Sequence, residues 1–252
     1  MSQNVSLDQA ELALNNSDPN GAERMLTEAW PDMTRAPGDA QHMMAMVRLA
    51  QGRGSEAESF MRGALNAEPN SLRHHIGLGH ILVSMRNDVG ALEAYSNAAR
   101  IDPKWPGLHV VISQTYYRLE RFADAERAAR QASPPTAASW EALSNALRAQ
   151  NKAQDALVAA EEALRLDWQD ANAQHAKAAA LMMLNRPQDA LSIFDDLIAA
   201  GVDLPVLFMN RGAALEALGR KADARAVYDE ASRRWPNLKN LQDRVAAARK
   251  RV

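Results

Sequence analysis

Hydrophobic positions recur along this chain with helical spacing, and short polar turns interrupt them at regular intervals. In residues 140–150, for example, Trp140, Leu143 and Leu147 fall on one stripe of a helix. Seven turn-like segments each end in an alanine, and successive alanines lie 35, 34, 34, 31, 34 and 34 residues apart. These turn alanines are Ala22, Ala57, Ala91, Ala125, Ala156, Ala190 and Ala224. The pattern predicts seven helical hairpins in a row.

Two further positions in each unit carry small side chains. Twelve residues before the turn alanines stand Ala10, Ala45, Gly79, Ser113, Ser144, Ala178 and Gly212. Seven residues after them stand Ala29, Ala64, Ala98, Ala132, Ala163, Leu197 and Ala231. We expect these positions to mark the places where neighbouring helices approach too closely for a larger side chain.

The turns divide residues 1–238 into seven units. Their expected bounds are 3–37, 38–71, 72–105, 106–136, 137–170, 171–204 and 205–238. The fourth unit is short, and Pro134 and Pro135 should end its second helix early. The first unit fits least well, with Pro31 and Pro37 bracketing a loop.

Residues 239–252 follow the last unit and predict one more helix. Leu238, Leu241, Val245 and Ala248 share a stripe there, with charged residues around the rest. A helix of this kind can cover the last hydrophobic surface of a repeat array. We therefore expect it to be a capping helix.

Residues 72–103 resemble a tetratricopeptide repeat, and residues 208–236 resemble one as closely. In the first of these segments the family pattern is carried by Leu78, Gly79, Ala91, Tyr95, Ala98 and Pro103. Trp140 and Phe208 stand where the family has its leading aromatic residue. The resemblance covers about 3–238 and implies an all-α fold: a right-handed superhelical solenoid of about seven hairpins with a C-terminal capping helix.

Composition and charge exclude several classes of function. Hydrophobic residues make up 47% of the chain but aromatic ones only 5%, and alanine dominates, which suits closely packed helices. The net charge of -2 lacks the basic excess of nucleic-acid-binding proteins. With no cysteine, the chain has no disulfide, zinc-thiolate site, iron-sulfur cluster or thiol nucleophile. No apolar stretch is long enough to span a membrane and the start resembles no targeting peptide, so we expect a cytoplasmic protein.

Catalytic and metal-binding motifs are also missing from the sequence. No HExxH, GxSxG or Walker-type glycine loop occurs. His74 and His75 are neighbours on a helix and point about 100 degrees apart, so they cannot share one small ligand. His42, His80 and His175 fall on first helices, without a carboxylate three or four residues later to complete a site. We therefore expect no enzyme activity, no metal and no cofactor.

In the resembled family, the first helices of successive repeats line a concave groove where ligands usually lie. The resemblance places eight candidate peptide- or partner-binding residues there: Arg73, His80, Gln114, Tyr117, Arg118, Asn145, Arg148 and Met182. The middle of this groove would carry three arginines and only one acid, Glu141. This excess predicts a mildly basic groove suited to carboxylates. Methionine suits an adaptable binding surface. The alternative is that the arginines pair with neighbours and the methionine fills a packing gap.

The sequence therefore predicts a noncatalytic scaffold or adaptor that holds a peptide or a partner helix, possibly one with acidic groups. The alternative is an accessory module for an enzyme of the sulfotransferase or 2-oxoglutarate-dependent oxygenase type. The active site would then belong to another chain, because this one lacks the HxD motif and the glycine loop those enzymes need. Self-association through the outer helices is a third possibility. Neither nucleic acid nor membrane is an expected partner.

Overall fold

All regular secondary structure in the described part of the chain is helical. The computed structural model describes residues 3–250, without the side chains of 3–6, 240, 244, 245 and 248–250. This range holds fifteen α-helices and one short 3-10 helix, Met33–Arg35, with no strand. The predicted all-α class is confirmed.

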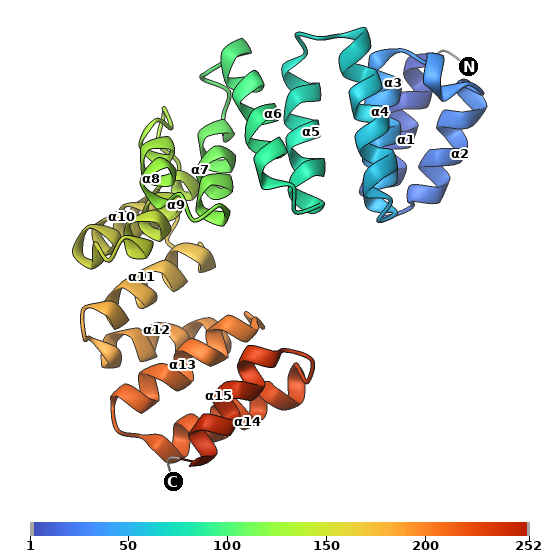
Figure 1. Cartoon of the computed structure of the whole chain (residues 1–252). Helices are drawn as coiled ribbons and strands as arrows, with labels where there is room; N and C mark the ends of the chain where they lie inside the picture. Colours follow the sequence, from blue (N-terminus) through green and yellow to red (C-terminus); the bar gives the residue numbers. More distant parts are fainter. Residues whose placement is uncertain (1–2, 251–252) are drawn as a thin grey trace. The chain divides into compact units, whose positions relative to one another are not determined.

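The first fourteen α-helices form seven hairpins along the sequence (Figure 1). The hairpins are α1 (Gln3–Asn15) with α2 (Pro19–Ala29), α3 (Gly38–Ala50) with α4 (Gly54–Ala67), α5 (Leu72–Ser84) with α6 (Asp88–Ile101), α7 (Leu108–Arg118) with α8 (Phe122–Arg130), α9 (Ala137–Ala149) with α10 (Ala153–Leu166), α11 (Ala171–Met183) with α12 (Pro187–Ala199), and α13 (Pro205–Ala217) with α14 (Lys221–Arg234). Each unit defined from the sequence holds one of these pairs, and α15 (Lys239–Lys250) follows the last.

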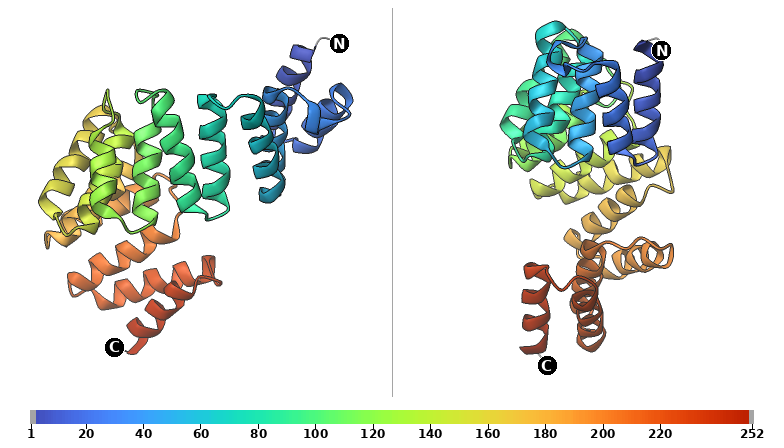
Figure 2. Two further views of the ribbon diagram at one scale, coloured as in Figure 1. Left: turned by 45° about the horizontal axis from the view of Figure 1, so that its top comes forward. Right: turned by 90° about the vertical axis from the view of Figure 1, so that its right-hand side faces the viewer.

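The chain forms two compact units, one ending at Arg121 and one beginning at Phe122. The boundary falls within the fourth repeat, between α7 and α8. In the N-terminal unit, α1 contacts α3 and α3 contacts α5, while each second helix packs between first helices. In the C-terminal unit, α11 contacts both α9 and α13, and α15 packs against α14 (Figure 2). First helices of successive hairpins therefore contact one another from α1 to α5 and from α9 to α13.

The small-residue positions lie where helices meet. All seven turn alanines are at most 1% exposed, and the small residues twelve positions before them are buried as well. At one such contact, Ser144 Oγ donates a 2.7 Å hydrogen bond to the backbone oxygen of Ala156. The expectation of burial is confirmed at these two positions of every unit, whereas at the third position Ala29 and Ala132 are only half-buried.

Every turn within a hairpin contains one residue in the left-handed region, five positions before the turn alanine. These residues are Ser17, Gly52, Arg86, Glu120, Asn151, Asn185 and Gly219, with φ between 57° and 75°. A β-carbon in this region costs about 1–2 kcal/mol, which glycine avoids. Only two of the seven turns place glycine there, so the backbone geometry is set by the hairpin and not by the residue.

We expect Arg86→Gly to stabilise the protein by about 0.5–1 kcal/mol, because it removes left-handed strain at an exposed position. Gly52→Arg is the matched reverse change in the preceding repeat and should destabilise by a similar amount. Urea denaturation followed by circular dichroism measures both. Equal midpoints for the two variants would contradict this account of the turn.

A repeated side-chain bond fixes the loop between successive hairpins. The residue sixteen positions before the turn alanine is a histidine or a glutamine in three repeats. Its side-chain nitrogen forms a hydrogen bond with the backbone oxygen of the residue six positions before it. The pairs are His75 with Pro69, His109 with Pro103 and Gln174 with Trp168, at 3.0, 3.0 and 2.9 Å. Gln242 of α15 makes the same bond to Pro236, at 3.2 Å. His75 and His109 thus fix the loops that precede their helices.

The C-terminal helix, α15, packs against α14. Leu241 is fully buried, and Ser232 Oγ donates a 2.9 Å hydrogen bond to Gln242 Oε1. The side chains of Val245 and Ala248, which the sequence places on the same stripe, and residues 251 and 252 lie outside the described residues.

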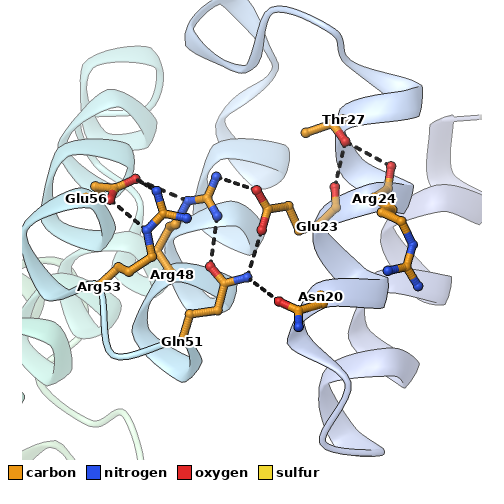
Figure 3. A network of polar contacts seen from close by, with 8 residues as sticks. All are labelled: Asn20, Glu23, Arg24, Thr27, Arg48, Gln51, Arg53 and Glu56. Carbon is orange, nitrogen blue, oxygen red and sulfur yellow. Dashed lines mark hydrogen bonds and ion pairs between the residues drawn. The ribbon is translucent and has the colours of Figure 1, made fainter.

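A polar network joins the first two hairpins (Figure 3). The Arg48 side chain is 10% exposed, and its Nη2 lies 2.7 Å from Glu23 Oε1. Gln51 Nε2 donates to Glu23 Oε2 at 2.7 Å and to Asn20 Oδ1 at 3.1 Å. The bond from Arg48 is the main reason that the pKa of Glu23 falls to about 2. Glu56 lies on the other side of the guanidinium, 3.4 Å from Nε.

Candidate functional site

The first helices of the N-terminal unit carry two rows of side chains that the core does not fully enclose. Eleven residues before the turn alanine the row is Met46, His80 and Gln114; eight residues before it, the row is Leu49, Val83 and Tyr117. His80, Gln114 and Tyr117 are exposed, and the other three are half-buried. We call these six residues, with Arg73 and Arg118, the first-helix face of the N-terminal unit. It mixes apolar, aromatic and hydrogen-bonding groups.

His80 and Tyr95 meet behind this face. Their ring centroids lie 5.8 Å apart in an edge-to-face arrangement, with Tyr95 reaching forward from α6. Burial lowers the pKa of His80, so its ring is neutral at pH 7. A neutral imidazole can both donate and accept a hydrogen bond.

The two arginines of this face are ion-paired within the protein. Arg73 Nη1 lies 3.3 Å from Asp39 Oδ1, with both side chains 54% exposed. Arg118 Nε lies 2.6 Å from Asp88 Oδ1, and its Nη2 donates to Thr115 Oγ1 at 3.2 Å. The sequence did not reveal the second pair because Asp88 comes from a second helix, α6, one repeat earlier. The local positive charge is therefore lower than a count of first-helix residues indicates.

Two histidines from successive repeats form a buried pair in the same unit. His42 on α3 and His74 on α5 are 6% and 0% exposed, and their Nδ1 atoms lie 3.1 Å apart. One ring must donate and the other accept, so the contact requires at least one neutral ring. Glu68 Oε2 lies 3.4 Å from Nε2 of His74. The sequence analysis correctly excluded a shared ligand for His74 and His75, but it did not foresee that His74 contacts His42, 32 residues away.

We expect this histidine pair to make folding sensitive to acid. The pKa of His42 is lowered from an ordinary value of 6.5 to about 3. Burial is the largest cause, and the charges of Arg73 and His74 add to it. Between these values the unfolded chain binds the proton more readily, so stability falls as the pH falls. From pH 6.5 to 5 the loss from His42 is about 2 kcal/mol. Urea denaturation at the two pH values measures it.

The matched control for this experiment is His42→Ile with His74→Leu. The replacements are the residues that other repeats place in these positions, Ile76 and Leu108. The double variant should lose the part of the pH dependence that arises from the pair. A double variant with the acid sensitivity of the unchanged protein would assign the effect to other groups.

The C-terminal unit presents a chain of three polar side chains along α9. Asn145 Nδ2 donates to Glu141 Oε1 at 2.9 Å, and Arg148 Nη2 donates to Asn145 Oδ1 at 2.9 Å. All three are half-buried. Burial and the nearby Asp170 raise the pKa of Glu141, against the lowering effect of Asn145 and Arg148. The Nε of Arg148 is buried and has no hydrogen-bond acceptor among the described residues.

The adjoining first helices, α11 and α13, add a further polar pair. His175 Nε2 and Asn210 Nδ2 lie 2.9 Å apart, so the amide donates to the ring. Burial, and then the charge of Arg148, lowers the pKa of His175 to about 4, so it is neutral at pH 7. Met182 is half-buried and Met183 is 41% exposed. The sequence analysis placed His175 on a first helix but did not predict its contact with Asn210.

The eight predicted binding residues fall into two sets. Arg73, His80, Gln114, Tyr117 and Arg118 are all exposed in the N-terminal unit. Asn145, Arg148 and Met182 are half-buried in the C-terminal unit, where the first two bond to each other. The N-terminal set is therefore the more accessible one, and the role of all eight in binding stays a prediction.

Two kinds of site are missing from the described residues. Within 3–250, no three histidine, aspartate or glutamate side chains gather in a way that could hold a metal ion. Over the same span, no helix has the length and apolarity to cross a bilayer.

This geometry defines an α-helical repeat protein built from hairpins of one kind. A family described as tetratricopeptide repeat matches residues 175–238. No curated protein matches the sequence. The fold is similar to that of a tetratricopeptide repeat protein from Parabacteroides merdae, with a TM-score of 0.80 and 13% identity over 97% of this chain and 98% of that one.

Two further solved structures share the fold. In the Cut9–Hcn1 heterotetramer of the APC/C, the matching chain has a TM-score of 0.78 at 14% identity, over 98% of this chain and 49% of that one. YrrB, described as a TPR protein with an unusual peptide-binding site, has a TM-score of 0.53 at 19% identity, over 75% of this chain and 97% of its own. Residues 175–238 thus match the tetratricopeptide-repeat family, and the fold of the chain is that of tetratricopeptide-repeat proteins, a fold that generally serves protein-protein interaction.

Proposed function

We propose that this protein is a noncatalytic interaction scaffold that holds an extended peptide or a partner helix on the first-helix face of its N-terminal unit. The observation that carries the proposal is the exposure of the whole predicted set on that face, Arg73, His80, Gln114, Tyr117 and Arg118, in contrast to the buried positions beside it. The solvent-exposed parts of these side chains can contact a partner while their contacts within the protein hold them in place.

The chemistry of the face favours a segment with an acidic group. The guanidinium of each arginine carries several N–H donors, and one carboxylate cannot accept from all of them. Arg73 shares its contact with an aspartate that is itself 54% exposed, so a partner carboxylate can join or replace that pair. Tyr117, 37% exposed, offers a flat aromatic surface on the same face. Two of the structural relatives, the Cut9–Hcn1 assembly and YrrB, are described by what they assemble with or bind, which supports the class of function.

Selection of peptides from a displayed random library on the whole protein tests this proposal. We expect the selected peptides to be enriched in Asp and Glu. Arg73→Gln with Arg118→Gln should weaken their binding about tenfold or more in titration calorimetry, with a larger loss at low salt. Neutral glutamine is chosen over charge reversal because Arg118→Glu would oppose Asp88 directly.

The matched control is Arg62→Gln with Arg100→Gln, two exposed arginines on the second helices α4 and α6. This control removes the same charge from the same unit and should leave affinity within about twofold. Equal losses in both double variants would show a general charge effect and no site on this face. Selected peptides without acidic enrichment would remove the arginines from the proposed role.

A further inference from the structure

A cavity lies between α8 of the fourth repeat and α9 of the fifth. It arises because α8 is shorter than the second helices of other repeats. Helix α8 has 9 residues, whereas α4, α6, α10 and α14 have 14. In those four helices the third small residue of the repeat lies inside the helix. In the fourth repeat the corresponding residue is Ala132, two positions beyond the last residue of α8. The early end of α8 leaves space beside α9.

The walls of this space are largely apolar. A cavity of 170 Å³ lies there, lined by Ala129, Ala132, Pro135, Ser139, Trp140 and Leu143, with Arg130 at one side. Trp140 takes the position that holds a loop-bonding His75, His109 or Gln174 in other repeats. A large ring thus replaces a polar anchor and forms one wall.

The polar wall groups already have partners. Ser139 Oγ donates to the backbone oxygen of Thr136 at 2.8 Å and accepts from the Thr136 backbone N–H at 2.9 Å. Arg130 donates from Nε and Nη2 to Glu126 Oε1 at 3.0 and 2.9 Å. Ser139 therefore offers a polar occupant no free donor, whereas Arg130, whose side chain is 53% exposed, keeps donors that Glu126 does not use. The other lining side chains are alanine, proline, leucine and the ring of Trp140, which favour an apolar group. The cavity selects an apolar group.

We propose that this cavity, which we call the α8–α9 pocket, binds one aromatic side chain of a partner polypeptide. Its volume is close to the roughly 150 Å³ of an apolar cavity that accepts benzene. The indole of Trp140 can pack edge to face with a second ring. The occupant takes the place of the last turn that α8 lacks. In the other repeats named above, the longer second helix itself supplies this turn. That the ring belongs to a polypeptide rests on the proposed scaffold function, but the selectivity for an apolar ring does not.

Nuclear magnetic resonance of the whole nitrogen-15-labelled protein tests the pocket. Each of the 5 tryptophans gives one indole signal, and Trp140→Phe identifies the signal of Trp140. Toluene serves as the bare ring. Two capped pentapeptides, Gly-Gly-Phe-Gly-Gly and Gly-Gly-Ala-Gly-Gly, present a ring or a methyl group on a peptide backbone. We expect toluene and the Phe peptide to move the Trp140 signal saturably, with millimolar affinity, and the Ala peptide to leave it unmoved.

Ala132→Leu should fill the pocket and weaken both interactions at least tenfold. Ala153→Leu, at another half-buried alanine of the same unit, is the matched control and should change neither. If Ala132→Leu does not fold, Ala132→Met is the second filling variant, because its unbranched side chain adapts to irregular space.

Three outcomes overturn the proposal. The first is a Trp140 signal that does not respond to toluene, and the second is an equal response in the filled variant. The third is binding of toluene without binding of the Phe peptide, which would leave an apolar pocket but remove its polypeptide occupant. Failure of the arginine variants to weaken peptide binding would affect only the scaffold proposal, since none of those residues lines the α8–α9 pocket.

Discussion

Gly79→Ala should destabilise the protein by about 2 kcal/mol, although alanine is the better helix former. A β-carbon at this position would lie 2.3 Å from Cε1 of Tyr95, which is far inside van der Waals contact. Tyr95 is 1% exposed and cannot move aside without disturbing α6. Urea denaturation of the single variant measures the loss.

The matched experiment uses a pairing that the chain itself employs. Gly212 and Tyr228 repeat the arrangement, with a β-carbon on the glycine 2.2 Å from the Tyr228 ring. In the first repeat, the same two positions hold Ala10 and Leu26, both fully buried. In a protein that already carries Tyr95→Leu, adding Gly79→Ala should therefore leave the free energy of unfolding unchanged or raise it. Additive losses in the double variant would show that the ring is not what excludes alanine.

The repeat fold could be read from the sequence because its determinants are local. A small residue at a fixed distance from a turn needs no knowledge of the rest of the chain, and burial of Gly79, Ala91 and Ala98 follows from the register alone. The left-handed turn positions were not evident, since Arg86 and Glu120 occupy them without the glycine signal. There the hairpin imposes the conformation on unfavourable residues.

The candidate site was less predictable because its charges depend on contacts between repeats. Arg118 meets Asp88 from the preceding repeat, and His42 meets His74 from the next. Which position of one helix faces which position of its neighbour is set by how the helices are displaced along each other, and this does not appear in a single repeat. The positions of His80, Gln114 and Tyr117 on first helices came from the family resemblance, and all three side chains are exposed.

Two junctions between hairpins use a polar contact where others place leucine. The glutamate directly after a turn alanine bonds to a glutamine at the end of the next first helix, Glu23 with Gln51 and Glu126 with Gln150, at 2.7 and 2.9 Å. At the register-equivalent positions of three other junctions, the sequence has Leu92 and Leu119, Leu157 and Leu184, and Leu191 and Leu218. The polar pair and the leucine pair are thus alternative solutions to one contact.

The cations around the two glutamates differ in exposure, and this difference decides what their loss should cost. Arg48 beside Glu23 is 10% exposed, whereas Lys152 and Arg130 beside Glu126 are 44% and 53% exposed. A buried guanidinium that loses its carboxylate cannot regain full hydration, but exposed cations can. The pKa of Glu126 is also lowered to about 2, mainly by its bond from Lys152.

Glu23→Leu should therefore cost about 2–3 kcal/mol, since Arg48 loses its close carboxylate and keeps a neutral hydrogen bond to Gln51 Oε1 at 2.8 Å and the longer contact to Glu56. Glu126→Leu should cost about 1 kcal/mol, and adding Gln150→Leu should recover most of it by forming the leucine pair. Urea denaturation at pH 7 measures all three. Both carboxyl pKa values are lowered in the folded protein, so their contribution is complete above pH 4.5 and disappears as the pH falls towards 2. The gap between the unchanged protein and Glu23→Leu should narrow over that range. A gap that stays constant with pH, or equal costs for the two glutamates at pH 7, would mean that the burial of Arg48 does not determine the strength of this junction.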